Sequence, residues 1–156
     1  MISLSHNFIY IHIPKTAGNS ITACLQNYSA DEIVWRPSSG HIKNEDGKQG
    51  LDVINKSLGG DLRMQKHAKV NDYAQNLGQQ ISKFKIVVSV RNPYDRIISY
   101  TAFSKQEPLP ERRLELGELC FPEPMINYVK AKNFMPDLKI IRYENLEDDY
   151  NKICGE

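Results

Sequence analysis

The chain has 156 residues, of which 40% are hydrophobic and 25% charged, and this predicts one globular domain over residues 1–156. Its 20 Lys and Arg residues nearly balance its 19 Asp and Glu residues, leaving a formal net charge of +1. This balance excludes a strongly basic nucleic-acid coat, an acidic tail protein and a charge-driven disordered chain. We therefore expect no nucleic-acid partner, and any anion site has to be built locally.

The cysteine pattern and the N-terminal residues bear on the compartment. The 3 cysteines are widely spaced and form no CxxC pair, so neither a disulfide framework nor a bound metal is predicted. No apolar run approaches the ~20 residues that a membrane span needs. The first residues lack the basic start and small-residue cleavage site of a signal peptide, so we expect a cytoplasmic protein without a targeting segment.

The first predicted elements form the opening of a βα unit. Residues 7–13 (NFIYIHI) are almost continuously apolar, which is typical of a strand buried on both faces. The loop PKTAGNS follows at residues 14–20. Helical spacing then relates four residues: Ile21, Cys24, Leu25 and Tyr28. A strand, a glycine-bearing loop and a helix in this order are the start of a βα unit.

The middle of the chain carries a weak pattern followed by a clear one. Residues 29–69 contain a turn-rich SSGH and a segment at 51–58 whose pattern suits a short helix. A helix is predicted from the spacing of Val70, Tyr73, Leu77 and Ile81.

A second strand is predicted at residues 85–90 (KIVVSV) and passes directly into a helix. Asn92 suits the N-cap of that helix and Pro93 its first turn. Its inner face is expected to carry Tyr94, Ile97, Ile98 and Thr101. The Pro- and charge-rich residues 105–113 predict an exposed loop.

The last third of the chain predicts a helix at 123–132, a strand at 138–142 and a final helix capped by Asn145. The first of these helices is expected to turn Met125, Ile126 and Val129 inward, and the last to carry Leu146, Tyr150 and Ile153. Strands that alternate with helices predict an α/β fold, with three layers and a mainly parallel central sheet flanked by helices.

The first candidate site is the loop at residues 14–20. Free N–H groups and the helix dipole favour an anion where a strand passes into a helix. Gly18 would let the backbone approach a ligand, while Thr16, Asn19 and Ser20 offer short side-chain donors. Lys15 adds one positive charge. The order is not that of a Walker A loop, in which the lysine comes late, and a plain turn with a solvated lysine is the alternative.

The second candidate site is Arg91, at the carboxyl end of the second strand, where ligands of open α/β sheets collect. Its guanidinium could grip a phosphate through two hydrogen bonds. Ser99 lies about 10 Å further along the predicted helix and reaches the same phosphate only if Arg91 folds back. Alternatively, Arg91 ties the strand end to a carboxylate. Two anion sites on two strand ends favour one ligand with two separated phosphates.

Three segments carry a family resemblance: HIPKTAGNS at 12–20, VVSVRNPYDRIISY at 87–100 and IIRYENL at 140–146. Together they resemble the sulfotransferases that use 3′-phosphoadenosine 5′-phosphosulfate (PAPS), and most closely the carbohydrate-type branch and its bacterial relatives. The resemblance implies a P-loop-like fold that needs neither nucleotide hydrolysis nor a metal.

The resemblance also implies roles for individual residues. The 5′-phosphosulfate would be cradled by Lys15, Thr16, Ala17, Gly18, Asn19 and Ser20, and the 3′-phosphate by Arg91 and Ser99. The implied reaction moves the sulfuryl group in line to an acceptor hydroxyl on a small molecule or glycan and releases 3′-phosphoadenosine 5′-phosphate (PAP). Lys15 would stabilise the negative charge that develops on the leaving oxygen.

The general base is less well defined. The resemblance places a histidine before the helix that leads to the second strand, and His67 matches that place. Glu45 and other acidic residues of the weak segment are alternatives, and His41 lies in a predicted turn. His12 is expected to be a packed strand residue and His6 incidental.

Several further residues have a structural or an aromatic role in the prediction. Glu144 is expected to support the second helix through Arg96. Four aromatic residues could stack on adenine or sugar, and only the last lies in a loop-like context: Tyr94, Tyr100, Phe103 and Trp35.

The chain also departs from the family pattern, since members normally continue beyond RYENL with further helices and a basic loop. A naturally minimal enzyme, a truncated gene and a site completed by a second copy are the alternatives, and Lys105, Arg112 and Arg113 could supply a positive lid. The alternative function is a non-catalytic or truncated PAPS- or PAP-binding module. A kinase is disfavoured because no Walker A sequence is present.

Overall fold

A computed structural model of the chain describes residues 1–3, 5–25, 28, 33–36, 40–43, 67–104, 122–132 and 136–155. The strands are β1 (Ile2–Ser3), β2 (Phe8–Ile11), β3 (Ile33–Arg36), β4 (Gly40–Lys43), β5 (Lys85–Val90) and β6 (Leu138–Arg142). The α-helices are α1 (Gly18–Leu25), α3 (Val70–Leu77), α4 (Pro93–Ser104), α6 (Ile126–Val129) and α7 (Leu146–Cys154). Two 3₁₀ helices, η2 (Gly78–Lys83) and η3 (Tyr143–Asn145), follow α3 and β6.

The main sheet brings the ends of three strands to one edge. Its order is β1-β2-β5-β6, and β3 pairs with β4 in a separate hairpin. β2 and β5 are parallel, with Ile11 opposite Val88, and β6 continues in the same direction with Arg142 opposite Val90. β1 is antiparallel to β2. The carboxyl ends of β2, β5 and β6 therefore lie side by side, and the prediction of an α/β fold is confirmed.

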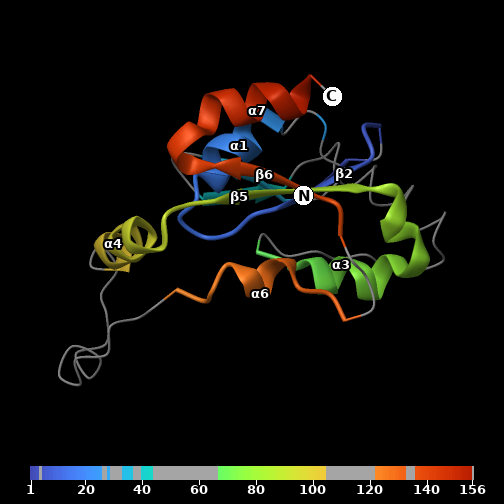
Figure 1. Cartoon of the computed structure of the whole chain (residues 1–156), viewed down its shortest axis with the longest axis horizontal. Coiled ribbons are helices and arrows are strands. Elements are labelled where there is room, and N and C mark those ends of the chain that lie inside the picture. Colours follow the sequence, from blue (N-terminus) through green and yellow to red (C-terminus); the bar gives the residue numbers. More distant parts are fainter. Residues whose placement is uncertain are drawn as a thin grey trace.

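Helices cover both faces of this sheet (Figure 1). α1 and α7 lie over one face and α3 and α6 over the other, while α4 stands beside the edge. The side chains of β2 alternate accordingly, with Ile9 and Ile11 in the cluster toward α3 and Tyr10 in the cluster toward α1. This arrangement buries each face of the sheet against its own helices.

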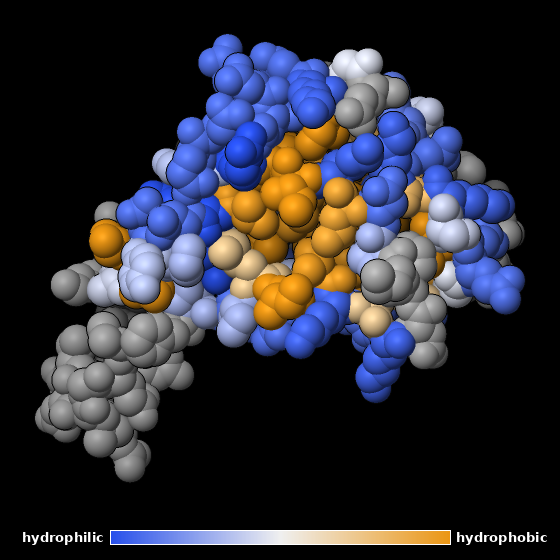
Figure 2. All heavy atoms as spheres, viewed as in Figure 1, coloured by the Kyte–Doolittle hydropathy of each residue, from blue (hydrophilic) through white to orange (hydrophobic). Residues whose placement is uncertain are grey.

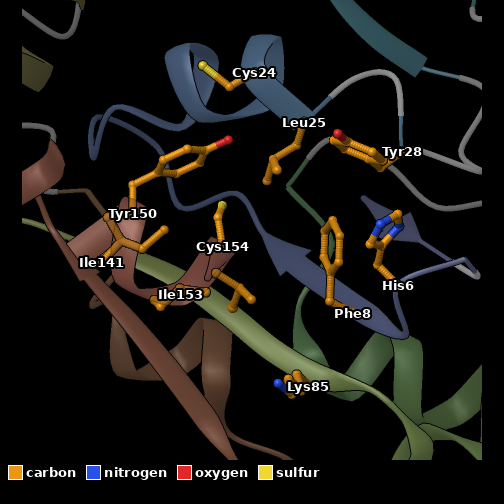
Figure 3. A pocket seen from close by; sticks show the side chains of 11 residues that line it. His6, Phe8, Cys24, Leu25, Tyr28, Lys85, Ile141, Tyr150, Ile153 and Cys154 are labelled. Atoms are coloured by element: carbon orange, nitrogen blue, oxygen red, sulfur yellow. The ribbon is translucent and has the colours of Figure 1, made fainter. Parts of the chain in front are cut away.

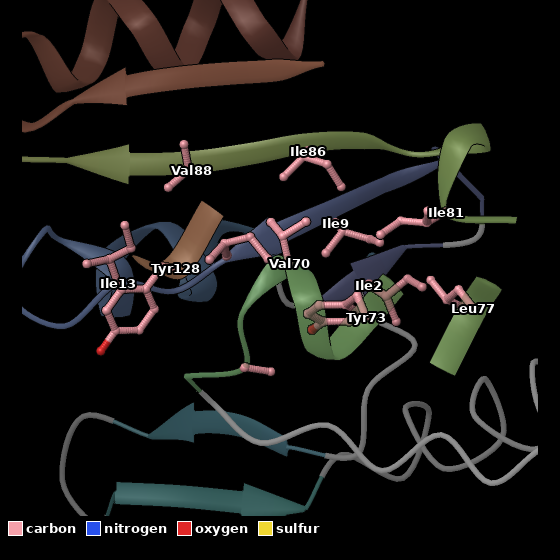
Figure 4. Close-up of a cluster of buried hydrophobic side chains, with 12 residues drawn as sticks. Ile2, Ile9, Ile13, Val70, Tyr73, Leu77, Ile81, Ile86, Val88 and Tyr128 are labelled. Atoms are coloured by element: carbon pink, nitrogen blue, oxygen red, sulfur yellow. The ribbon is translucent and has the colours of Figure 1, made fainter. Parts of the chain in front are cut away.

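The larger core cluster joins the sheet to α3 (Figure 4). The four residues whose spacing predicted this helix are all buried: Val70, Tyr73, Leu77 and Ile81. Each such side chain removed from water contributes roughly 1.5–3 kcal/mol. The Tyr73 hydroxyl also accepts a hydrogen bond of 2.8 Å from the N-terminal ammonium of Met1. The predicted helix is thus confirmed, although its last turn is the 3₁₀ helix η2.

The predicted inner face of α4 is wrong. Tyr94 is 77% exposed and Ile98 is 68% exposed, whereas Arg96 of the same helix is only 3% exposed. The prediction assumed that apolar residues face the domain. The helix instead packs against the domain through the Arg96 guanidinium, which donates hydrogen bonds to two backbone carbonyls.

Predictions for two other regions of the chain need correction. Trp35 lies in strand β3 and His41 in β4, although the sequence suggested a loop and a turn there. α6 is only four residues long and Ile126 is 55% exposed, while Tyr128 takes the buried position. Figure 2 shows apolar side chains gathered across the region between α7 and α6, with hydrophilic residues around them. The predictions for residues 51–58 and 105–113 lie outside the described residues.

Candidate functional site

The candidate site is the sheet edge at which the chain leaves β2, β5 and β6. The lysine loop, residues 12–17, follows β2, and the arginine turn, residues 91–92, follows β5. Because β2 and β5 are adjacent and parallel, with Ile11 opposite Val88, the two segments leave the sheet at the same edge. The sequence expectation that both anion motifs meet at one edge is thus met by the topology.

The lysine loop has an unusual backbone. Lys15 and Ala17 both have φ of 67°, in the left-handed region that non-glycine residues rarely adopt. Each such residue costs on the order of 1–3 kcal/mol and persists only where its surroundings hold it. Strain of this kind gathers at ligand-binding segments, so the loop has the character of a functional site.

Thr16, between these two residues, does not present its hydroxyl to a ligand. Its side chain is fully buried. Its Oγ1 donates to the Ile13 carbonyl at 2.8 Å and lies 2.8 Å from the Ser89 hydroxyl. The prediction of a side-chain donor at Thr16 is therefore corrected, and only its backbone N–H is left for an anion.

The N-terminus of α1 follows the loop, with Gly18, Asn19 and Ser20 as its first residues. The N–H groups of a first helical turn have no acceptor within the helix, and the dipole makes this end positive. Ser20 is exposed, and Asn19 is half-buried. The side-chain oxygen of Asn19 is a buried acceptor without a partner among the described residues.

Gly18 has a role that differs from the predicted close approach to a ligand. A Cβ at this position would lie 2.1 Å from Cδ2 and 2.2 Å from Nε2 of His12. The absent side chain therefore makes room for the His12 ring, which is itself buried. Glycine is required here by a neighbouring side chain.

The Lys15 side chain reaches α4. Its Nζ lies 4.3 Å from the centre of the Phe103 ring, a cation–π contact. Partial burial lowers the pKa of Lys15, and the positive charge of Arg91 lowers it further. The two cations thus lie within electrostatic reach, and an anion between them would relieve their repulsion.

The Arg91 guanidinium has a buried N–H group without a hydrogen-bond acceptor among the described residues. Its guanidinium carbon lies 4.0 Å from the centre of the Tyr143 ring, directly after β6. Its Nε is buried and has no hydrogen-bond partner within the described part of the chain. Leaving a buried donor unpaired costs about 1–3 kcal/mol. A phosphate oxygen would satisfy it, so the residues present fit an anionic group here.

Glu144 supports the arginine turn directly. Its Oε1 accepts a hydrogen bond of 2.6 Å from the backbone N–H of Asn92. That bond is the main reason why the pKa of Glu144 is lowered. Asn92 in turn caps α4, with its Oδ1 accepting from the Tyr94 N–H at 2.9 Å. The predicted cap is confirmed, whereas the predicted support through Arg96 is wrong.

Arg96 joins α4 to the lysine loop. Its Nε donates to the Pro14 carbonyl at 2.9 Å and its Nη1 to the Glu123 carbonyl at 2.8 Å. These bonds explain why a charged residue occupies the inner face of α4. Ser99 and Phe103 are four residues apart on this helix and so share a face. Ser99 is thus on the side of α4 that contacts Lys15, and its role toward a phosphate stays a prediction.

His67 lies beside the lysine loop. Its Nδ1 is 2.8 Å from the His12 carbonyl oxygen, and the two imidazole rings are 4.8 Å apart with their edges facing. A carbonyl can only accept, so Nδ1 carries the hydrogen, and the neutral ring has its lone pair on Nε2. His67 is exposed. The structure therefore brings His67 to the loop, and its role as a base stays a prediction; Glu45 lies outside the described residues.

Asn145 does not cap α7 with its side chain, which is a correction. Its Nδ2 donates instead to Asp149 Oδ1 at 3.0 Å. Asp149 also accepts two bonds from the Arg142 guanidinium, at 2.7 and 2.8 Å. This ion pair fixes the turn from β6 into α7, which carries Tyr143.

A separate cavity of about 430 Å³ lies over the face of the sheet that α1 and α7 cover (Figure 3). It is lined by Phe8 and Lys85, which begin β2 and β5. Lys15 and Arg91 follow the other ends of these strands. The cavity is therefore separate from the candidate anion site.

Four residues of the site escaped prediction: Tyr10, Ser89, Arg96 as a loop contact and Tyr143. Of these, only Tyr143 had a usable signal, because it directly follows the third predicted strand. In the described ranges, no three or more His, Cys, Asp or Glu side chains gather as metal ligands would. No helix among the described residues has the length and apolar character needed to cross a membrane.

Comparison with protein families finds a match for most of the chain. Residues 1–107 match the model described as the sulfotransferase family. This match covers more than half of the chain and includes both the lysine loop and the arginine turn. No curated protein matches the chain. No solved structure matches it either.

Proposed function

We propose that this chain, which belongs to the sulfotransferase family, moves a sulfuryl group from PAPS to an acceptor hydroxyl, on a sugar or another small molecule. One observation carries the proposal. Lys15 and Arg91 converge at one sheet edge, and the buried Nε of Arg91 has no hydrogen-bond partner within the described residues. A ligand with two separated phosphates would meet both cations.

The donor would bind with its 5′ end on the lysine loop and its 3′-phosphate on the arginine turn. The N–H groups at residues 16–20 and the Lys15 ammonium suit the phosphosulfate, in the manner of other P-loop-like sites. The Tyr143 ring supports the Arg91 guanidinium from one side. This leaves the guanidinium edge for a phosphate, with Ser99 as the proposed second contact.

Transfer needs in-line geometry and charge stabilisation. The acceptor oxygen forms a bond to sulfur while the bond from sulfur to the 5′-phosphate oxygen breaks, and PAP leaves with the electron pair. Lys15 is the proposed catalytic cation that stabilises this charge. Preorganised donors of this kind contribute about 3–4 kcal/mol to the transition state.

The proposed base is His67, which would take the acceptor proton at Nε2. The hydrogen bond from its Nδ1 to the His12 carbonyl supports this assignment, because it orients the ring and selects the tautomer. A base in this position contributes about 10²–10⁴-fold to the rate. His67→Gln should therefore lower turnover while leaving PAP affinity within about twofold.

Titration calorimetry with PAP tests the donor site. Lys15→Ala and Arg91→Ala should each weaken binding by about 10–100-fold, because each removes a charge-assisted hydrogen bond worth about 1.5–3 kcal/mol. The matched control is Lys152→Ala, an exposed lysine of α7. It should bind PAP like the natural chain.

Transfer of labelled sulfate from PAPS to a panel of sugar and small-molecule hydroxyls tests the reaction. Absence of PAP binding by the natural chain refutes the proposal. Tight PAP binding without transfer to any acceptor supports the alternative of a non-catalytic PAPS- or PAP-binding module. ATP that outcompetes PAP would indicate a kinase-like site.

A further inference from the structure

Lys15 is held from both sides by hydrogen bonds that lie outside the proposed donor contacts, one partly buried and the other buried. On one side, the Pro14 carbonyl accepts the 2.9 Å bond from Arg96 of α4. On the other, the Thr16 hydroxyl enters a chain of three buried hydroxyls, called here the hydroxyl chain: Tyr10, Ser89 and Thr16. Lys15, between these contacts, has the left-handed φ of 67°.

The direction of the hydroxyl chain follows from counting its hydrogens. Thr16 has one hydroxyl hydrogen and donates it to the Ile13 carbonyl. Ser89 therefore donates to Thr16 over 2.8 Å, and Tyr10 donates to Ser89 over 2.7 Å. Ser89 and Thr16 each accept one hydrogen bond and donate another, so each bond in the chain polarises the next.

The members of the chain come from different parts of the site. Tyr10 belongs to β2, and Ser89 belongs to β5, two residues before Arg91. Burial raises the pKa of Tyr10 well above its usual range, so the phenol keeps its hydrogen at neutral pH. A buried hydroxyl needs a partner. The hydrogen bonds of the Ser89 hydroxyl link the lysine loop to β5, the strand that leads into the arginine turn.

We propose that Arg96 and Ser89 are positioning residues, which fix Lys15 in its left-handed conformation and so set its place relative to Arg91. This inference rests on the proposed function for its consequence, the binding of PAP. Its structural part, the conformation of Lys15, can be measured without any ligand. Misplacing a binding group by about 1 Å can cost about 10²-fold in activity.

Two measurements test the inference, and the first needs no ligand. The backbone ¹³C chemical shifts of Lys15 report its φ. In both Ser89→Ala and Arg96→Lys these shifts should move away from left-handed values. The first variant removes the hydrogen bond to the Thr16 hydroxyl, and in the second a lysine cannot make the two bonds of the guanidinium. Unchanged Lys15 shifts in both variants overturn the inference.

The second measurement is a double-mutant cycle read out as PAP affinity. Ser89→Ala should weaken PAP binding about five- to tenfold in the natural chain, but less than about twofold when Lys15 is already alanine. Equal losses in both backgrounds overturn the inference, because they show an effect that does not pass through Lys15. If the natural chain binds no PAP while the Lys15 shifts respond, the proposed function fails and the positioning role stands.

Two further variants keep the test sharp. Thr22→Val is the matched control, because the Thr22 hydroxyl is buried in α1 without a hydrogen-bond partner among the described residues. It should leave PAP affinity and the Lys15 shifts unchanged. Tyr10→Phe removes only the first donor of the hydroxyl chain and keeps the ring, so it serves where Ser89→Ala does not fold. A Lys15 shift unaffected by Tyr10→Phe then counts against the inference.

Discussion

Gly18→Ala tests how the start of α1 is packed. The added Cβ would lie 2.1 Å from Cδ2 of the His12 ring, closer than real Cβ contacts come. The ring cannot move freely, because it is buried and packs edge-on against His67 at 4.8 Å. Either the ring or the first turn of α1 must shift. We therefore expect a less stable protein and a displaced lysine loop.

The size of the effect follows from two opposing terms. Overpacking of this severity costs about 2–3 kcal/mol, while alanine gains about 1 kcal/mol over glycine in a helix. The net loss of unfolding free energy is then about 1–2 kcal/mol. For a chain of this length the melting temperature falls by about 2–4 °C per kcal/mol, which gives a fall of roughly 2–8 °C.

Thermal unfolding followed by circular dichroism measures this change. Gly155→Ala is the control, since its Cβ would meet Asn151 O at an ordinary 3.4 Å, and its melting temperature should stay nearly unchanged. In a His12→Ala background the collision is absent, so Gly18→Ala should cost much less there. An equal loss in both backgrounds would refute the packing argument.

Further predictions concern charge and strain at the site. The pKa of Lys15 is lowered in the free protein, so PAP binding should be accompanied by proton uptake at alkaline pH. As pH rises, PAP affinity should begin to decrease at a lower pH than that at which an ordinary lysine loses its charge. Calorimetry in buffers of different ionisation enthalpy measures the proton uptake. Tyr143→Ala should weaken PAP binding about twofold to thirtyfold, because a cation–π contact with Arg91 contributes about 0.5–2 kcal/mol, and Tyr143→Phe should restore it. Hydrogen bonds lower the pKa of Asp149, so its stabilisation is present at neutral pH and lost as pH falls below about 4; urea unfolding of Asp149→Asn should show a flatter acid limb. Ala17→Gly should raise the unfolding free energy by about 0.5–1 kcal/mol, since glycine adopts a φ of 67° without strain.

The strands of the sheet were the most predictable part of the fold. β5 and β6 have the predicted bounds, because runs of branched apolar residues are flanked by residues that suit an exposed edge or turn. Their alternation between two faces follows from the pleat. The position of Lys15 and Arg91 at one edge follows in turn, because parallel neighbours end together.

The orientation of α4 could not be predicted from its periodicity. Spacing shows that Tyr94 and Ile98 share a face, but not whether that face meets the domain. The outcome depends on whether the Arg96 guanidinium finds acceptors, and these are carbonyls of Pro14 and Glu123, 82 and 27 residues away in sequence. Hydrogen bonds to distant backbone leave no trace in a local pattern.

The same reason explains why the support of the lysine loop was missed. Thr16 in a loop of small polar residues looks like a ligand donor, and Ser89 in a strand looks like a tolerated polar residue. Their hydroxyls meet only because β2 and β5 are neighbours in parallel register. Pairing across 73 residues has to be seen in the structure.

The backbone strain at Lys15 indicates that its side chain is kept at a cost in folding stability. Folding alone would favour glycine at the two positions with a φ of 67°, because a side chain there costs free energy. Lys15 nevertheless has that conformation, with its cation directed to Phe103 and within reach of Arg91. The hydrogen bonds to the Pro14 carbonyl and the Thr16 hydroxyl offset the cost, and they do so without using the ammonium group or the first N–H groups of α1. Because these contacts do not involve the Lys15 ammonium, the charged group stays available for a ligand. The chain has a net charge of only +1, so its overall electrostatic field is weak, and the local geometry of the loop selects the ligand.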